Sequence, residues 1–219
     1  MSRHRYMVWA LLVFGCGIAS AQVAHQQHPP QSTDACIQAL EDPGRDEWQR
    51  PDDVVDRLGL RQGDEVADLG AGSGYFTMRL AHAVGPAGKV YAADVDPKML
   101  DYITQRAQKE QLDNIQTILA DPNDPKLGSR SVDMIFICDT LHHIANRSKY
   151  YPLLVRALRP GGRLVNIDFQ KRKLPVGPPE EMKIDKKACI KEIEAAGFHF
   201  VEEPDILKYQ YFLVFELEN

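Results

Sequence analysis

The sequence predicts an α/β fold in which helices cover both faces of a mostly parallel, doubly wound sheet. From about residue 50, short apolar runs alternate with helical patterns, and this order implies right-handed crossovers between parallel strands. The apolar runs are nearly continuous, and Val132–Cys138 (VDMIFIC) is the clearest of them. Strands of this kind are expected where both faces of a sheet are covered.

The first half of the folded region is expected to hold three helices and two strands. Pro51 suits the first turn of a helix and Gly59 suits the position after its end. The expected elements are a helix over 51–58, a strand over 65–69, a helix over 74–84, a strand over 89–94 and a helix over 97–110. The last helix has an apolar face made of Met99, Leu100, Ile103 and Ala107.

The second half is expected to add strands and then to change its pattern. Strands are expected over 115–119, 132–138 and 163–168, with a helix over 151–158 before the last of them. Asp185 and Gly197 bracket a final helix as N-cap and C-terminal residues. Two strand-like runs, 199–203 and 209–216, then follow without an intervening helix. We therefore expect an antiparallel hairpin at one edge of the sheet.

The composition is that of an ordinary globular chain. The 219 residues are 44% hydrophobic, and the formal net charge of −5 argues against a broad nucleic-acid surface. Four cysteines occur without any CxxC pair, and Cys16 falls in the apolar leader described next. The other three, Cys36, Cys138 and Cys189, predict neither a disulfide framework nor a metal site. No pattern in the sequence indicates an oligomeric state.

Residues 1–21 have the pattern of a secretory signal peptide. Two arginines precede an apolar run, and Ala19-Ser20-Ala21 supplies a small-x-small cleavage pattern. Cleavage would export the protein to the periplasm or the medium. A lipoprotein box ending at Cys16 is disfavoured by the bulky Phe14, and an uncleaved leader would leave a membrane anchor. Apart from a retained leader, we expect no stable membrane span.

The rest of the chain is predicted to divide into a linker and one domain. Residues 22–44 contain Gln, Pro and Gly pairs typical of a linker, with a short helix possible over 34–40 if Asp34 caps it. Residues 45–219 are expected to form the folded domain.

A glycine-rich loop follows the strand over 65–69. The pattern is D-x-G-x-G-x-G, running from Asp68 through Gly70 and Gly72 to Gly74. Glycines let the backbone turn sharply and approach a ligand, and a helix N-terminus then offers free N–H groups. The dinucleotide fingerprint G-x-G-x-x-G would need glycine at position 75, which is Tyr75. The acidic Asp68 favours a cationic ligand such as S-adenosylmethionine (SAM) over a pyrophosphate.

From about Trp48 onward the chain resembles the class I SAM-dependent methyltransferases of the type 11 kind. The resemblance rests on four segments: 68–74, 90–94 (VYAAD), 133–144 and 158–164 (LRPGGRL). It implies a Rossmann-like sheet of seven strands with the final strand antiparallel. It also implies SAM as the cofactor, and we expect a small-molecule methyl acceptor as the partner.

Candidate cofactor-binding residues follow the ends of the predicted strands. Asp94 ends the second strand, where an acid can accept hydrogen bonds from ribose hydroxyls, although an N-cap role is an alternative. The resemblance places Asp121 near an adenine amine, within a loop that departs from the common pattern. The full set of candidates is Asp68, Gly70, Ala71, Gly72, Gly74, Asp94, Val95, Asp121 and Asp139.

Candidate catalytic residues lie after the fourth and fifth strands. His142 and His143 follow the fourth strand, and Asp168 ends the fifth, at the edge where open α/β sheets bind ligands. Either histidine is a candidate base or polar wall, and a pair of histidines at a helix start is the alternative. The basic and proline-rich stretch 171–179 is a candidate lid over an anionic acceptor, or a solvated loop. Arg45 and Trp48 are candidates to complete that lid.

These residues favour methyl transfer by in-line displacement at a sulfonium carbon. Orientation and exclusion of water supply most of what such a reaction needs, so the absence of a catalytic triad does not exclude it. Two alternatives remain open: a non-catalytic SAM-binding module and a nicotinamide-dependent oxidoreductase. The tyrosine at position 75 and the terminal hairpin argue against the oxidoreductase.

Overall fold

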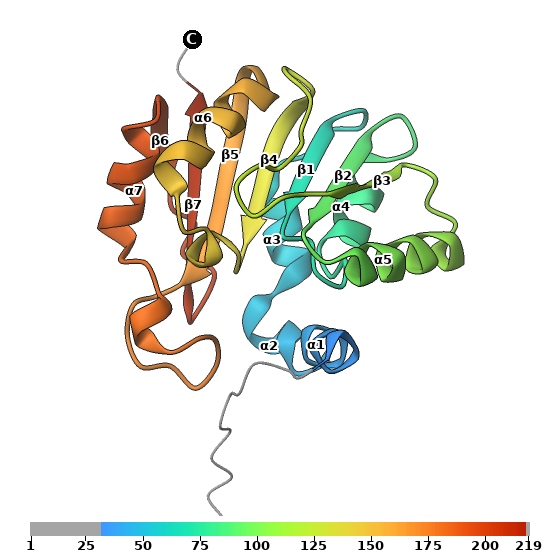
Figure 1. The fold of residues 1–219 in the computed structure, drawn as a ribbon, viewed down its shortest axis with the longest axis horizontal. Coiled ribbons are helices and arrows are strands. Elements are labelled where there is room, and N and C mark those ends of the chain that lie inside the picture. The colour runs from blue at the N-terminus through green and yellow to red at the C-terminus, as the bar shows by residue number, and fades with distance from the viewer. Residues whose placement is uncertain (1–31, 218–219) are drawn as a thin grey trace, which may run out of the picture.

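A seven-stranded sheet in the order β3-β2-β1-β4-β5-β7-β6 forms the centre of the molecule (Figure 1). The computed structural model describes residues 32–217, so the predicted leader lies outside the described residues. The strands are β1 Glu65–Leu69, β2 Lys89–Asp94, β3 Ile115–Leu119, β4 Val132–Cys138, β5 Leu158–Phe169, β6 Phe198–Glu202 and β7 Gln210–Leu217. Strands β1 to β5 pair in parallel, and β7 runs antiparallel to both β5 and β6. The predicted fold class and its terminal hairpin are confirmed.

Most of the predicted helices are found with small shifts at their ends. The helices are α1 Thr33–Leu40, α2 Arg45–Gln49, α3 Pro51–Leu58, α4 Thr77–Val84, α5 Pro97–Glu110, α6 Arg147–Ala157 and α7 Lys186–Glu194, with short 3₁₀ turns η1 Leu141–His143 and η2 Glu180–Met182. Helix α4 begins three residues later than expected, because Gly74 has a φ of +79° that an α-helix does not accept. Helix α6 begins earlier than expected and contains Pro152 at its midpoint.

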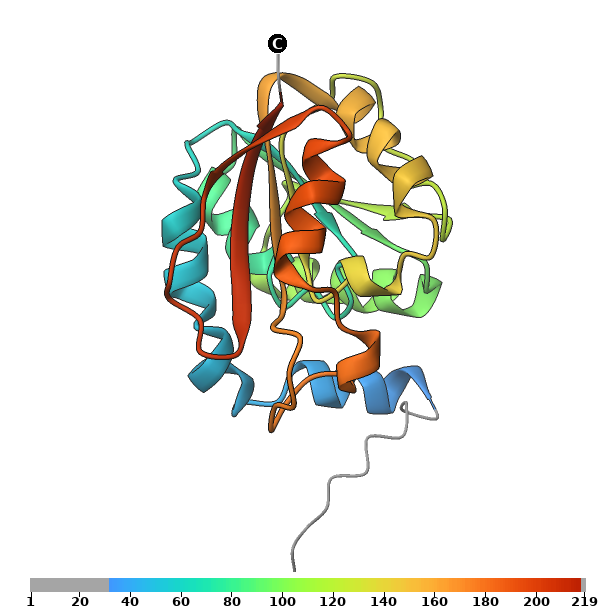
Figure 2. The ribbon, with the colours of Figure 1, turned by 90° about the vertical axis from the view of Figure 1, so that its left-hand side faces the viewer.

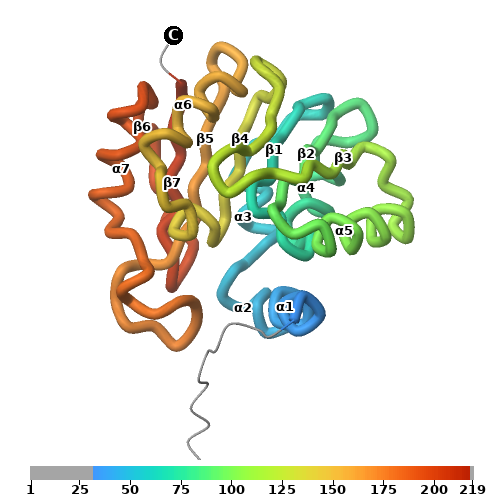
Figure 3. The backbone as a smooth tube through the Cα atoms, in the orientation of Figure 1, coloured from blue at the N-terminus to red at the C-terminus, as the bar shows by residue number. Residues whose placement is uncertain are grey.

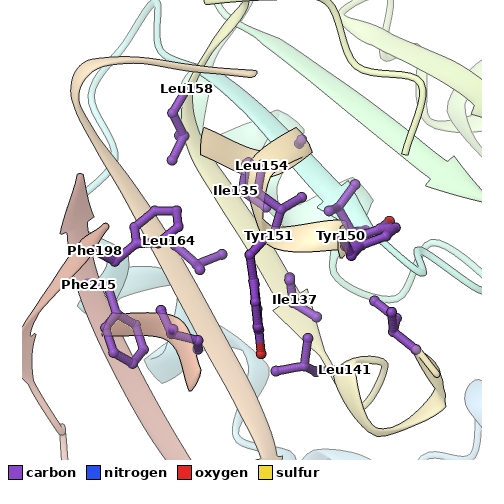
Figure 4. Packing of buried hydrophobic residues seen from close by; sticks show 14 of the residues in the cluster. Ile135, Ile137, Leu141, Tyr150, Tyr151, Leu154, Leu158, Leu164, Phe198 and Phe215 are labelled. Carbon is purple, nitrogen blue, oxygen red and sulfur yellow. The ribbon is translucent and has the colours of Figure 1, made fainter. Parts of the chain in front are cut away.

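Helices cover both faces of the sheet, as the continuous apolar strands predict. Figure 2 shows α3 on one side of the sheet and α6 and α7 on the other. Alternate residues of one strand face opposite cores. In β4, Met134 and Phe136 pack with α3 and α4, whereas Ile135 and Ile137 pack with α6 and α7. Figure 4 shows the second of these cores, with Tyr151 of α6 close to the labelled residues of β4 and β5.

Helices α1 and α2 lie beyond the carboxyl ends of the central strands (Figures 1 and 3). The helix expected over 34–40 is therefore present, although Ser32 caps it by accepting from the Ala35 N–H at 3.3 Å. Glu41, at the end of α1, receives a 2.7 Å hydrogen bond from Arg106 of α5. The described part of the predicted linker is thus bound to the domain.

The described residues contain neither a membrane-spanning helix nor a metal-binding cluster. No helix among residues 32–217 is long and apolar enough to cross a membrane. No group of three or more His, Cys, Asp or Glu residues in that range is arranged to hold a metal ion.

Candidate active site

A cavity of about 470 Å³ lies between the carboxyl edge of the sheet and helices α1 and α2. Its walls come from the loops after β1, β2, β3 and β4. Helices α1 and α2 form a cover over it, to which Cys36, Leu40 and Arg45 contribute. Five aspartates line it: Asp68, Asp94, Asp96, Asp121 and Asp139. Among the described residues, Arg45 is the only lysine or arginine that does so. The cavity is therefore strongly acidic.

The three glycines of the loop after β1 serve different purposes. A Cβ on Gly70 would lie 2.2 Å from the Thr140 Oγ1, so a side chain there would block the approach of the loop after β4. A Cβ on Gly72 would lie 3.0 Å from Leu40 in the cover. Gly74 does not line the cavity; its Cβ would crowd Ile103 of α5 at 3.0 Å. All three have positive φ, which L side chains rarely adopt.

Backbone N–H groups hold the Asp94 carboxylate in place at the end of β2. The Gly72 N–H donates to its Oδ2 at 2.8 Å, and the Asp96 N–H donates to its Oδ1 at 2.9 Å. Each oxygen keeps a lone pair for another donor, such as a ligand hydroxyl. The capping role considered for Asp94 belongs to Asp96, whose Oδ1 accepts from the Lys98 N–H and begins α5.

Asp68 is a buried acid at the base of the cavity. Only 3% of its surface is exposed, and the Thr77 hydroxyl donates to its Oδ2 at 2.6 Å. Burial raises the pKa of Asp68 to about 7, and the Thr77 hydrogen bond only partly opposes this. A cationic ligand beside Asp68 would favour its ionised form.

Asp139 forms a second acidic position in a strained turn after β4. Its φ of +55° is unusual for a non-glycine residue and turns the chain sharply out of the strand. The Gln210 amide donates to its Oδ1 at 2.6 Å, and the Arg45 Nη2 lies 3.6 Å from its Oδ2. Burial raises the pKa of Asp139 to about 6, while Arg45 counteracts the shift.

The cover over the cavity is joined to the glycine loop by side chains of α2. The guanidinium of Arg45 stacks on the ring of Tyr75, and the Tyr75 hydroxyl donates to Asp46. The Arg45 Nε and Nη2 also donate to Gln49 at 3.4 and 3.3 Å. Trp48 lies outside this network and packs against Phe169, with 5.6 Å between ring centroids. Of Arg45 and Trp48, the two residues expected to complete a lid, Arg45 lines the cavity and Trp48 does not.

The loop after β3 forms the far wall of the cavity. Asp121, from this loop, and the exposed Val95, from the loop after β2, both line the cavity. The Asp121 Oδ2 is also 2.6 Å from the Lys126 Nζ, so part of its carboxylate is already engaged. Whether a ligand amine meets Asp121 stays a prediction.

The three candidate catalytic residues lie close together, but only His143 lines the cavity. The His142 Nδ1 is 2.8 Å from the Asp168 Oδ1, and both side chains are buried. The two histidine rings lie 4.2 Å apart and are tilted by 44°.

The basic, proline-rich stretch 171–179 follows β5 and is mostly exposed. It is held to the domain by Gly177, whose Cβ would clash with the ring of Phe169, and by the Arg172 carbonyl, which accepts from Lys183 at 2.8 Å. None of its residues lines the cavity.

Several lining residues escaped prediction from the sequence. The sequence marks Tyr75 only as a departure from the dinucleotide fingerprint, and Cys138 only as a strand residue. Cys36 and Leu40 lie one helical turn apart in the stretch predicted as a linker, and this spacing was the available signal. Thr140 gave no signal, because its role depends on the approach of Gly70 from another loop.

Comparison with known proteins shows related sequences and a closely related structure. Residues 60–211 match the family model described as a methyltransferase domain. The ubiquinone/menaquinone biosynthesis C-methyltransferases UbiE of Hahella chejuensis and Pasteurella multocida are 32% and 31% identical over 130 residues, covering 59% and 57% of this chain. The matched region covers 51% and 46% of those proteins, so the chain spans about half the length of the curated relatives it matches.

A solved structure is similar over most of the chain. The crystal structure of a SAM-dependent methyltransferase from Aquifex aeolicus is 30% identical, with a TM-score of 0.80. The similarity covers 85% of this chain and 99% of that one. The fold around the cavity is therefore shared with that protein.

Proposed function

Because this chain belongs to the methyltransferase domain family and uses SAM as its cofactor, we propose that it transfers a methyl group from SAM to a small-molecule acceptor. The observation that carries the proposal is the acidic cavity, which joins the glycine loop, Asp94 and the loop after β4 under one cover. When bound, SAM supplies an electrophilic methyl group on a positively charged sulfur.

The residues present fit SAM in shape and in charge. Gly70 and Gly72 line the cavity with bare backbone, and their missing side chains allow Thr140 and Leu40 to pack closely against the loop. Asp94, already oriented by two backbone N–H groups, would hold the ribose hydroxyls. Asp68 and Asp139 would compensate the positive charges of the ligand, and Arg45 would lie near its carboxylate. The acidic wall disfavours a pyrophosphate, which argues against a nicotinamide cofactor.

The cover would help the chain exclude water from the reaction. Leu40 lies over Gly72, and Arg45 is buried between Tyr75 and Asp139. Removing water strengthens the interaction of buried carboxylates with a cation. It also keeps the electrophilic methyl group from reacting with solvent.

The acceptor is expected at the end of the cavity formed by the loop after β4. Cys138, Asp139, Thr140 and His143 line this end. The curated relatives are named as C-methyltransferases, which supports a carbon acceptor as one candidate class for this chain. A limited cavity supports a small acceptor, or a small reacting part of a larger one.

Turnover is the direct test of this function. The protein is incubated with SAM and a panel of small phenols, thiols and activated carbon acids, and release of S-adenosylhomocysteine (SAH) is measured together with the methylated product. We expect equimolar SAH and product with at least one class. SAM binding without transfer to any class would instead support the non-catalytic SAM-binding alternative.

A further inference from the structure

The turn after β4 directs two adjacent histidines to different environments. In η1, the buried Leu141 anchors the turn beneath Tyr151, and Figure 4 shows these two side chains near one another. His142 faces inward and only 3% of its side chain is exposed, whereas His143 is exposed and lines the cavity. One histidine therefore faces the end of the cavity proposed for the acceptor, and the other lies behind it.

The inward histidine is held by a fully buried carboxylate. The Asp168 Oδ1 lies 2.8 Å from the His142 Nδ1 and also accepts from the Phe169 N–H at 2.8 Å. A carboxylate is an acceptor, so this geometry assigns the proton on His142 to Nδ1.

Burying the His142–Asp168 pair costs free energy, so stability alone explains its presence poorly. The Asp168 Oδ2 has no hydrogen-bond partner within residues 32–217, and neither have the Asn166 Oδ1 and the Tyr211 hydroxyl. The three residues share one face of β5 and β7, since Asp168 is paired with Tyr211 in the antiparallel register. Buried polar groups without partners are destabilising, and they tend to be retained where they serve a function.

The outward histidine has the charge state that a proton acceptor needs. Although His143 is exposed at the cavity, the buried part of its ring and the neighbouring His142 lower its pKa, and the negative charge of Asp168 opposes them. Other charged groups near this end are Asp139 and Arg45 on the cavity wall, and Lys183, which is buried near Asp168. A neutral imidazole at pH 7 can take a proton, and a nearby negative charge stabilises the imidazolium that results.

We propose that His143 takes the proton of the methyl acceptor, and that Asp168 and His142 are a positioning pair that orients and stabilises it. The proposal rests on the proposed function and deepens it. The acceptor atom forms a bond to the methyl carbon while the carbon–sulfur bond breaks and its electron pair stays on sulfur. The proton of the acceptor moves to His143 and then to water.

The proposal defines a class of acceptor. A base is needed only where the attacking atom must lose a proton that it still holds at neutral pH. Phenols, thiols and activated carbon acids meet this condition. Carboxylates and tertiary amines do not, because they attack without losing a proton. The acceptor is therefore of the first kind.

The charge arrangement is testable without knowing the acceptor. Nitrogen-15 NMR of histidine-labelled protein, titrated from pH 5 to 8, reports the tautomer of His142 and the pKa of His143. We expect a proton on the Nδ1 of His142, facing Asp168, and we expect His143 to be neutral at pH 7. Asp168→Asn keeps an acceptor for His142 but removes the negative charge, so the His143 pKa should fall by about half a unit or more. The exposed His82 on α4 is the internal control and should not shift.

Three results would overturn the proposal: a His142 without a proton on Nδ1 at pH 7, a protonated His143 at pH 7, or an unchanged His143 pKa in Asp168→Asn. If that variant does not fold, His142→Gln separates the same two groups, and the His143 pKa should again change. SAM binding is measured on the same samples. Absence of binding by the wild-type protein overturns the proposed function, whereas binding with an unchanged titration overturns only the role of the pair.

In the turnover panel, phenols of low and high pKa provide the kinetic check. We expect His143→Ala to slow transfer to the phenol of high pKa at least tenfold while SAM affinity stays unchanged. Transfer to a phenol that is already ionised should be slowed much less. Equal slowing of transfer to both phenols would contradict a role of His143 in proton removal.

Discussion

The guanidinium of Arg45 lies over the ring of Tyr75, with 4.0 Å between its Cζ and the ring centroid. Tyr75 occupies the position where a dinucleotide-binding loop would have its third glycine. Tyr75 therefore distinguishes this loop from a dinucleotide-binding loop, and through Arg45 of α2 it also contacts the cover that α1 and α2 form over the cavity. Arg45 completes the connection through Asp139, at 3.6 Å.

Replacing Tyr75 with glycine restores the dinucleotide fingerprint and removes the anchor of the cover. We expect Tyr75→Gly to weaken SAM binding by roughly 10- to 100-fold, because a partly buried cation–π contact and a hydrogen bond are lost. NADH binding should stay undetectable, since the acidic wall is unchanged. Calorimetry with both ligands measures the two effects.

Tyr75→Phe is the matched control for that variant. It keeps the ring under Arg45 and removes only the hydroxyl that donates to Asp46. We expect it to retain most of the SAM affinity. If both variants bind SAM as the wild-type protein does, the anchoring role of Tyr75 is wrong.

Two glycines with nearly the same φ allow the cost of a positive φ to be separated from the cost of a steric clash. Gly70 has a φ of +71° and Gly161 a φ of +72°, but a Cβ would clash with Thr140 only at Gly70. We expect Gly161→Ala to cost about 1 kcal/mol in the free energy of unfolding, as a left-handed conformation does. Gly70→Ala should cost clearly more and should weaken SAM binding. Urea denaturation gives both values, and equal costs would show that the clash is absorbed.

The burial of Asp68 should make the free energy of unfolding depend on pH. Its pKa in the folded protein is about 7, above the ordinary value of 3.8, so folding favours the protonated form. Its contribution to stability is therefore fully present below pH 4 and is lost as the pH rises to about 7. Asp68→Asn should stabilise the ligand-free protein at pH 8, on the order of 2–4 kcal/mol, and change little at pH 4.

Thermal unfolding at the two pH values measures this difference. Asp101→Asn, an exposed change on α5, is the control and should have no effect at either pH. A destabilised Asp68→Asn at pH 8 would mean that its ionised form is better solvated than its burial suggests.

The affinity for SAM should rise with pH. The pKa values of Asp68 and Asp139, about 7 and about 6, place both carboxyls partly in their neutral form below pH 7. A cation prefers the ionised forms, so SAM binding must release protons at low pH and becomes weaker there. We expect several-fold tighter binding at pH 7.5 than at pH 5.5. The change should be smaller for SAH, which lacks the sulfonium charge, and equal slopes for the two ligands would contradict this account.

The sheet was predictable because its signals are local. The bounds of β1, β2, β3, β4 and α5 follow from apolar runs flanked by Gly, Pro and Asp, and the structure has them where the sequence placed them. The start of α6 was misplaced, because Arg147–Lys149 lack an apolar pattern and Pro152 reads as a helix start. At the start of the helix, Arg147 pairs with Glu192 of α7 at 2.7 Å, a contact between distant residues that the local sequence does not reveal.

The site was only partly predictable, for a physical reason. Asp68, Asp94 and the glycines could be found because one loop brings them together. The closing of the cavity depends on contacts between residues far apart in sequence, such as Leu40 with Gly72 and Arg45 with Asp139. Such pairs leave no mark in a short stretch of sequence. The pairing of His142 with Asp168 is of the same kind.

The most direct test of the central claim is SAM binding by isothermal calorimetry, comparing the wild-type protein with Asp94→Ala and Asp101→Ala. Both changes remove one aspartate, but only Asp94 lines the cavity. We predict that the wild-type protein and Asp101→Ala bind SAM equally, and that Asp94→Ala binds roughly 10- to 100-fold more weakly through the loss of hydrogen bonds to a charged group. Equal binding by all three proteins, or no binding by folded wild-type protein, would contradict the assignment of this cavity to SAM.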